Sequence, residues 1–245
     1  MINLSDVTIV SVNTRDPLYS VKAIEKSSKY IKFAEHLLIT NQHINHEFIQ
    51  CKIINTISSL SEYSKFCIKE LHQYINTKFC LIVQPDGFVT NPLMWTNDFL
   101  NYDYIGAPWD VLLSQRALSH SLNIHIDDLS KVPIIVGNGG FSLRSKKLLQ
   151  VCSELVYDDP NIPEDNFICL TNRETLKSKN IKFAPVSLAC RFAIERPLDL
   201  NWKHVNLESY FGVHGYKHLP EKALLFNLLE NYQDDLTSVK NALTF

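Results

Sequence analysis

The strongest constraint on the fold is the alternation of short apolar strands with amphipathic helical segments along the first part of the chain. Residues 7–12 form a β-branched run, and a turn then leads into a segment with apolar residues at helical spacing. Strand patterns return at 37–40, 51–55 and 79–83, and residues 61–75 read as a helix. This order predicts parallel βαβ units and therefore an α/β protein whose mixed, mostly parallel sheet is flanked by helices.

The remainder of the chain continues the pattern less regularly. We expect helices around 94–100, at 145–155 and from Pro163 onward, with one or two strands within 181–195. Residues 114–131 are polar and rich in histidine, and they show no clear period. Because no internal repeat or linker is present, we expect a single domain over residues 1–245, with a C-terminal helix in 221–245.

The composition of the chain excludes several classes of function. A chain of 245 residues with 45% hydrophobic content can bury a large core, and a net charge of −2 without a basic run argues against a nucleic-acid partner. The N-terminus lacks a signal peptide pattern and no apolar run could form a transmembrane segment, so we expect a cytoplasmic protein. The cysteines lack paired spacing and predict free thiols in a reducing compartment: Cys51, Cys67, Cys80, Cys152, Cys169 and Cys190.

A turn sequence follows the apolar run at 79–83. Proline, aspartate and glycine at 85–87 each favour a turn for a separate reason, so a plain turn explains Asp86. It does not explain the polar Gln84 at the strand's end. A functional carboxylate at the carboxyl end of a strand is the competing interpretation, because ligands bind there in α/β sheets.

Three further stretches each have a structural and a functional interpretation. Residues 136–141 concentrate three of the chain's seven glycines, which suits either a hairpin turn or backbone close to a ligand. They match neither a Rossmann nor a P-loop pattern. The aromatic residues of 102–109 suit ordinary packing or a wall for a flat ligand. His214 lies in a glycine-bearing loop, where a structural histidine is the plain alternative.

Acidic residues crowd near the helix predicted from Pro163. The helix dipole favours acids in the first turn, but four carboxylates within eight residues are more than one helix terminus uses. One of them is therefore a candidate base. The four are Asp158, Asp159, Glu164 and Asp165.

Taken in order, these motifs resemble a known family. The segments QPDGFV, YDYIGAPW, GNGGFSLRS, PED and FGVHG are similar to those of an uncharacterised group of glycosyltransferase-like proteins, a family of unknown function related to the GT-A fold. The resemblance covers residues 7–215. It implies a transferase that moves a sugar from a nucleotide-sugar, a UDP-sugar first of all, to a glycan or other hydroxyl acceptor, with a role in polysaccharide biosynthesis.

The resemblance also implies roles for individual residues. Asp86 corresponds to the metal-binding acid of a DxD-type motif, with Gln84 where its first acid would stand, and His214 would be a second ligand for Mn²⁺ or Mg²⁺. Gly139 and Gly140 would line the sugar sites. The missing first acid puts the need for a metal in question.

The same resemblance, together with the position of ligands in α/β sheets, completes the expected site. In an inverting enzyme Asp165, or its neighbour Glu164, would be the catalytic base. The nucleotide is expected at the end of the first strand. Its candidate contacts are Val12, Asn13, Thr14 and Arg15.

Two other functions compete with this one. A non-catalytic protein of the same fold that binds a nucleotide-sugar or a glycan would explain why Gln84 replaces an acid. An unrelated α/β hydrolase is disfavoured, because the chain has no GxSxG segment.

Overall fold

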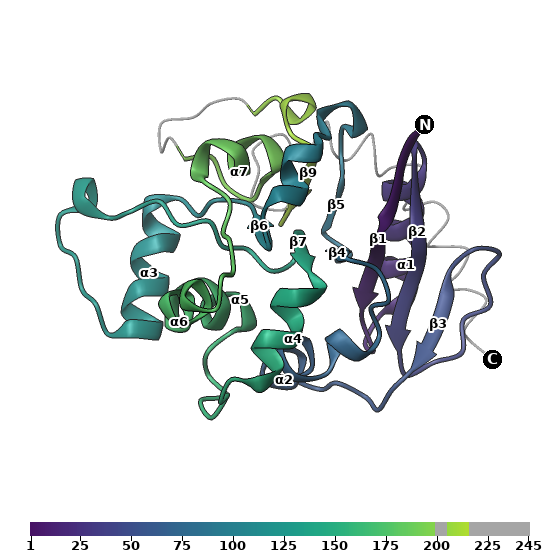
Figure 1. Ribbon diagram of the computed structural model, residues 1–245, viewed down its shortest axis with the longest axis horizontal. Helices are drawn as coiled ribbons and strands as arrows, with labels where there is room; N and C mark the ends of the chain where they lie inside the picture. The colour runs from purple at the N-terminus through teal and green to yellow at the C-terminus, as the bar shows by residue number, and fades with distance from the viewer. Residues whose placement is uncertain (199–204, 216–245) are drawn as a thin grey trace.

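The computed structural model describes residues 1–198 and 205–215 and shows two sheets with helices packed around them (Figure 1). The larger sheet has six strands in the order β3-β2-β1-β4-β7-β6. The helix expected in 221–245 lies outside the described residues. The strands of this sheet are β1 (Ile2–Val12), β2 (Ile31–Thr40), β3 (Gln50–Ile53), β4 (Phe79–Ile82), β6 (Tyr104–Gly106) and β7 (Ser142–Ser145).

Most neighbouring strands of the large sheet run parallel. β1 pairs in parallel with both β2 and β4, and β2 pairs in parallel with β3. β7 is antiparallel to β4 and to β6. The predicted α/β class with a mixed, mostly parallel sheet is therefore confirmed.

The smaller sheet joins segments that lie far apart in the chain. Its order is β5-β9-β8, with β5 antiparallel to β9 and β8 parallel to β9. This arrangement brings the turn that follows β4 next to the end of the described chain. The three strands are β5 (Gly87–Val89), β8 (Ala193–Ile194) and β9 (Gly212–His214).

Helices pack against the large sheet and against one another. α1 packs on β1, β2 and β5, and α2 packs beside α4. α3 lies at the opposite end of the molecule from β3 (Figure 1). The helices are α1 (Pro17–Ser28), α2 (Leu60–Lys69), α3 (Val111–Leu122), α4 (Lys146–Glu154), α5 (Glu164–Asn166), α6 (Arg173–Ser178) and α7 (Val186–Phe192).

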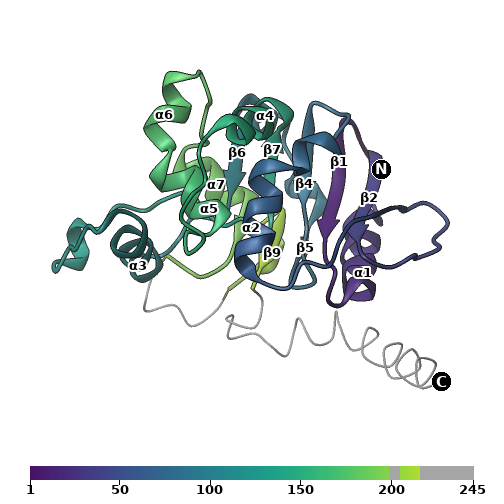
Figure 2. The same ribbon diagram turned by 90° about the horizontal axis from the view of Figure 1, so that it is seen from below.

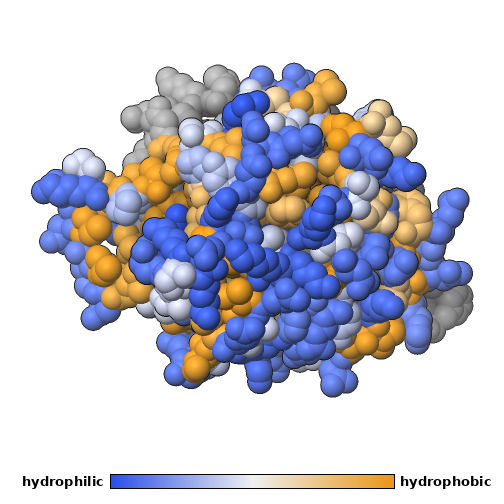
Figure 3. Space-filling model, viewed as in Figure 1, coloured by the Kyte–Doolittle hydropathy of each residue, from blue (hydrophilic) through white to orange (hydrophobic). Residues whose placement is uncertain are grey.

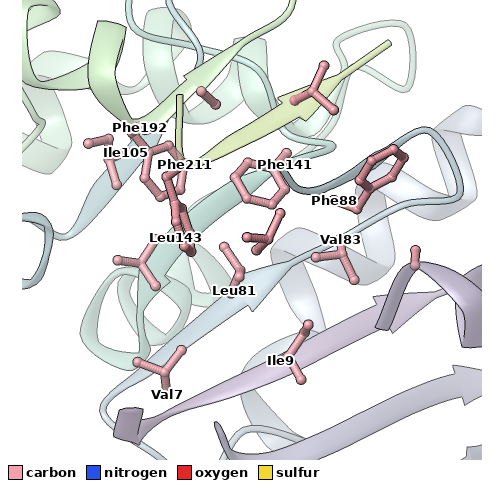
Figure 4. Close-up of a cluster of buried hydrophobic side chains, with 14 of the residues drawn as sticks. Val7, Ile9, Leu81, Val83, Phe88, Ile105, Phe141, Leu143, Phe192 and Phe211 are labelled. Carbon is pink, nitrogen blue, oxygen red and sulfur yellow. The ribbon is translucent and has the colours of Figure 1, made fainter. Parts of the chain in front are cut away.

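Alternation along the central strands divides the core into layers. Ile9 and Leu81 belong to the cluster shared with the small sheet, while the next residues, Val10 and Ile82, belong to the cluster that contains α2 side chains. Figure 4 shows the first cluster, where side chains from both sheets meet around Phe141 and Phe211. The central strands are thus covered on both faces, as parallel strands usually are.

Several segments differ from the sequence predictions. The helix expected at 94–100 is wrong, since Asn91 and Thr96 cap two short 3₁₀ turns, Pro92–Met94 and Asn97–Asn101. The strands expected in 181–195 are mostly wrong too. Pro185 precedes the first turn of α7, whose Ala189 and Phe192 face inward at helical spacing, and only β8 is extended.

The polar segment at 114–131 begins inside a helix that the sequence pattern did not reveal. Asp110 caps α3 by accepting a hydrogen bond from the Leu113 amide at 2.7 Å, and Asn123 ends it in the left-handed region with φ 54°. Figure 3 shows hydrophobic beside hydrophilic surface over α3, where Leu112 and Leu122 are exposed. This helix is amphipathic but only partly covered.

The helix predicted from Pro163 is present but broken. α5 runs into a π-helical segment, Phe167–Thr171, before α6 begins at Arg173. The six cysteines are free, as predicted, and four of them are buried. Among the described residues, no helix has the length and apolar character needed to span a membrane.

The junction of the two sheets should control stability. Phe211 is fully buried and contacts the rings of Phe99, Phe141 and Phe192. We expect Phe211→Ala to lower the free energy of unfolding by about 3–5 kcal/mol in urea titration, because it opens a cavity. Leu93→Ala, at a side chain that is 87% exposed, is the control and should change it by less than about 0.5 kcal/mol. If both variants lost the same free energy of unfolding, Phe211 would not be a core residue.

Candidate functional site

Three segments meet at the carboxyl edge of the large sheet. Gln84 follows β4 and Trp109 follows β6, while Gly139 and Gly140 precede β7. Because β7 is antiparallel to both neighbours, its beginning lies beside their carboxyl ends. These residues line a cavity of about 400 Å³, whose other walls come from α2, α3, α5 and the residues around His214. This is where α/β sheets bind ligands.

Residues 84–87 form the predicted turn. This turn is compatible with a functional role for the Asp86 carboxylate. Gln84 and Gly87 exchange two backbone hydrogen bonds of 3.0 and 2.9 Å around the turn. Gly87 then pairs with His214 across β5 and β9, and the amide of Gly215 donates to the Asp86 carbonyl at 2.9 Å. Strand pairing therefore brings Asp86 and His214 together from distant parts of the sequence.

His214 stands among four polar side chains. Its Nε2 lies 3.2 Å from Gln84 Oε1 and 3.7 Å from Asp86 Oδ1. Its Nδ1 lies 2.7 Å from Asn138 Nδ2 and 3.4 Å from Glu195 Oε1. One ring nitrogen thus faces the turn that carries Asp86, and the other is held by Asn138 and Glu195.

The charged forms of His214 and Glu195 stabilise each other. Burial alone would lower the pKa of His214, but the hydrogen bond and the charge of Glu195, with a smaller contribution from Asp86, raise it above its usual value. Burial disfavours ionised Glu195, yet its hydrogen bond and charge interaction with His214 outweigh this effect and lower the pKa of the carboxyl. When no cation is bound, each side chain therefore makes the charged form of the other more favourable.

The two glycines provide room for the charged groups. A Cβ on Gly140 would overlap the His214 ring and lie 2.7 Å from Gln84 Oε1. A Cβ on Gly139 would overlap the Glu164 carboxylate. We expected both residues to line sugar sites, and they do line the cavity. In the structure, however, side chains at these positions are excluded by the site's own residues.

The two candidate bases have different surroundings. Glu164 is buried and accepts a 2.9 Å hydrogen bond from Arg144, which is itself fully buried. Asp165 is only partly buried, and its Oδ2 accepts a 3.1 Å hydrogen bond from the Gly139 amide. Glu164 is engaged in an ion pair, whereas the Asp165 carboxylate lines the cavity with no ion-pair partner among the described residues.

The environment of Asp165 suits proton transfer. Loss of hydration and then the nearby charge of Glu164 raise the pKa of Asp165 to about 7, against the bonds from the Asn166 and Gly139 amides, which lower it. A carboxylate with a pKa near the working pH is well matched to general base catalysis.

The residues expected to bind the nucleotide lie apart from the cavity. Val12 ends β1, and Asn13 organises the following turn by accepting from the amides of Arg15 and Asp16, both at 3.0 Å. Thr14 Oγ1 bonds both backbone groups of Ile57, at 2.9 and 3.0 Å. The Arg15 side chain is 92% exposed. Among the expected cofactor-binding residues, Gln84, Gly139 and Gly140 line the cavity, whereas Asp86 and these four do not.

The donor set near His214 fits a divalent cation only in part. One carboxylate, one imidazole and one amide oxygen converge, which suits Mn²⁺ or Mg²⁺ with further oxygen ligands from a bound phosphate. In the described ranges, no group of three or more His, Cys, Asp or Glu side chains is arranged to hold a metal. Asp86, His214 and Gln84 would hold the ion, and a ligand would complete its shell.

Several cavity residues were missed from the sequence. Glu195 comes just after the short strand β8, and Tyr63 in α2 accepts a 2.9 Å hydrogen bond from the Gln84 amide group. Arg116 and His120 come from α3. The cap at Asp110 and the inward-facing Ala117 and Leu118 are signals that could have revealed α3.

The fold and the site together define an α/β protein with a charged ligand cavity at the carboxyl edge of a mostly parallel sheet. The chain belongs to the family described as "Protein of unknown function (DUF5672)", whose model matches residues 45–214. The family resemblance drawn from the sequence motifs is thereby confirmed.

A solved structure, a crystal structure of an active-site mutant of LgtC, is similar over 92% of this chain and 95% of that chain, with 14% identity and a TM-score of 0.48. A search of the curated proteins found no match.

The raised pKa of Asp165 predicts a pH-dependent stability. Protonated Asp165 favours the folded state, so its contribution is complete below the unfolded pKa near 4 and is lost as pH rises through about 7. We expect Asp165→Asn to gain stability relative to the wild type across this window, by at most about 1.4 kcal/mol per pH unit, and to gain nothing further above it.

Urea titrations from pH 4 to 9 measure this difference. Asp158→Asn, at an exposed carboxylate, controls for removal of one negative charge. A difference that does not change between pH 4 and 7 would contradict the assigned environment of Asp165.

Proposed function

We propose that the protein is a glycosyltransferase that moves a sugar from a nucleotide-sugar to a hydroxyl group of a glycan. A UDP-sugar is the first candidate for the donor. One observation carries the proposal. A single cavity joins a partly buried carboxylate with a pKa of about 7, Asp165, to a second polar cluster around His214 and Gln84. Membership of the family whose motifs prompted this expectation supports it.

Asp165 is the proposed base of an inverting reaction. The acceptor hydroxyl attacks the anomeric carbon from the face opposite the leaving nucleotide, and a carboxylate beside it takes the hydroxyl proton. Two amide hydrogen bonds, from Gly139 and Asn166, orient the Asp165 carboxylate. Glu164 is the weaker candidate, because its carboxylate is already held by Arg144.

The opposite end of the cavity is proposed to receive the diphosphate. Departure of the nucleotide leaves negative charge on a phosphate oxygen, and Gln84 and His214 offer hydrogen-bonding groups at the cavity wall. A divalent cation bound by Asp86 and His214 would act there as a Lewis acid. The nucleoside would extend toward the turn of Asn13 and Arg15, at the carboxyl end of β1.

A binding protein without turnover is the second candidate. Gln84 supplies no negative charge where the implied motif has an acid, so the site holds a cation less strongly. Such a protein would retain its nucleotide-sugar unchanged. Release of nucleoside diphosphate therefore separates the two functions.

The first test of the proposal measures that release. We expect a set of UDP-sugars with Mn²⁺ to stabilise the protein by about 2.7 kcal/mol at 100 times the dissociation constant. In the presence of acceptor glycans, the bound donor should release UDP. Asp165→Asn should bind the donor normally and lose about 10²–10⁴-fold in rate, since only the base is removed.

Glu164→Gln is the comparison variant for this experiment. Breaking the buried pair should cost about 3–5 kcal/mol of stability. Any remaining folded fraction should lose less rate than Asp165→Asn does, because the base is still present. Full activity of Asp165→Asn would refute its role as base, and donor binding without UDP release from any acceptor would favour the binding protein.

The metal assignment has its own test by calorimetry. We expect Asp86→Asn to weaken donor binding at least tenfold in Mn²⁺ and far less in chelator, because asparagine preserves the turn but removes the charge. His214→Ala should act similarly, and the double variant should be far from additive, since both residues act through one ion. Equal donor affinities for all variants, with and without Mn²⁺, would reduce Asp86 to a turn residue.

A further inference from the structure

The α3 side of the cavity carries two polar side chains that the proposed mechanism does not use. Arg116 and His120 are four residues apart on α3, and both line the cavity together with Leu113 and Ala117. Residues at this spacing share one face of a helix. α3 therefore presents a mixed cationic and apolar face to the ligand space.

This face lies at the Asp165 end of the cavity. Asn166, which follows Asp165, donates a 2.7 Å hydrogen bond to Ser121 Oγ of α3. α3 also packs against the π-helical segment that continues from α5. Figure 2 shows α5 lying between α3 and α2. The polar groups of α3 thus border the place assigned to the acceptor, away from the turn that carries Asp86.

Arg116 and Asp165 are the charged groups lining this end of the cavity that no ion pair within the described residues holds. Glu164 is paired with Arg144, and Glu195 is paired with His214. Arg116 makes no hydrogen bond or ion pair within residues 1–198 and 205–215, and it is an exposed side chain. A guanidinium stays charged at any physiological pH. An anionic ligand group in the cavity can replace water beside this guanidinium and accept its hydrogen bonds.

A neighbouring carboxylate is the main competitor for Arg116. Asp127 lines a second cavity, of about 380 Å³, which Arg116 also borders. The two side chains form no ion pair within 4.0 Å in the described part of the chain, whereas Asp128 does pair with Lys131 at 3.2 Å. The guanidinium therefore remains available to the cavity beside Asp165.

An aromatic wall completes the acceptor end. Trp109 is 5% exposed and lines the cavity, and its backbone amide is fixed by a 2.8 Å bond to the Ile135 carbonyl. Gly137 lies so close to its indole that a Cβ would overlap the ring. The ring is closely packed, and the small part of it that faces the cavity is an apolar surface that a sugar ring can contact.

We propose that the acceptor is a sugar bearing an anionic group, a carboxylate or a phosphate, which Arg116 binds with help from His120 while the sugar ring packs on Trp109. The inference rests on the proposed function only in identifying the bound sugar as the acceptor of a transfer reaction. Arginine presents paired N–H donors that match a carboxylate or a phosphate, and His120 adds a ring donor beside it. A neutral acceptor would offer the guanidinium no charged partner.

Ligand binding followed by NMR tests this proposal without turnover. The probes are methyl β-glucuronide, glucose 6-phosphate and the neutral methyl β-glucoside, at constant ionic strength. We expect at least one anionic probe to bind the wild type tenfold or more tightly than the glucoside. Arg116→Gln should abolish that preference, and His120→Gln should reduce it.

The matched control is Arg191→Gln, which changes an exposed arginine of α7 that does not line this cavity. It should keep the preference of the wild type. The carboxylate and phosphate probes distinguish the two kinds of acceptor. Equal binding of all three probes to the wild type, or a preference that survives Arg116→Gln, would overturn the proposal.

Two further measurements separate the alternatives. If Arg116→Gln weakened UDP binding as strongly as probe binding, the anion would belong to the donor and the proposal would fall. If it lowered stability in urea and left the probe preference intact, Arg116 would serve the fold through Asp127, which also overturns the proposal. Retained probe preference without any sugar transfer would refute the proposed function alone.

Discussion

The buried ion pair of Arg144 and Glu164 is the interaction on which the site depends. Arg144 lies in β7 with no exposed surface, and it donates to Glu164, to Ser142 Oγ and to the Gly139 carbonyl. The bond to Ser142 lies within β7, whereas the bonds to Gly139 and Glu164 tie the glycine loop and α5 to the sheet. Removing a guanidinium from water is costly, and only well-made partners compensate for it. The geometry of both the glycine loop and α5 is therefore coupled to one side chain.

This coupling explains why neighbouring acids have different chemistry. Glu164 points inward to Arg144, which leaves the next residue, Asp165, at the edge of the cavity. The negative charge of Glu164 then contributes to the raised pKa of Asp165. One carboxylate is fixed in a buried ion pair by Arg144, and burial, followed by the charge of Glu164, raises the pKa of the other to about 7. Paired carboxyl groups with divergent environments are the usual arrangement for acid and base roles.

Sequence reasoning was successful where a pattern reflects burial on two faces or a local turn. The runs that became β1 and β4 are covered on both sides, and α4 lies within the helix expected at 145–155. It failed where tertiary packing overrides local preference. Residues 186–192 have apolar and branched side chains that suit a strand, yet they form α7, because Phe192 packs onto Phe99 and Phe141.

The site was predictable to a similar degree. Asp86 and His214 were named from motifs, but their proximity depends on the pairing of β5 with β9, which no local pattern specifies. Glu195 was missed because nothing in its own sequence neighbourhood distinguishes it from a surface glutamate. Its role beside His214 Nδ1 follows from β8 and β9 running in parallel. Long-range strand pairing was thus the missing information.

The two glycines then determine how close the proposed chemical roles lie. Gly139 faces Glu164 and donates its amide to Asp165, while the adjacent Gly140 faces His214 and Gln84. Neighbouring Cα atoms are about 3.8 Å apart, so the acidic end and the imidazole end are separated by a single step of the chain. A side chain at either position would push these groups apart. A short separation is what a transferase requires, because its base and its leaving group act on opposite faces of one carbon atom.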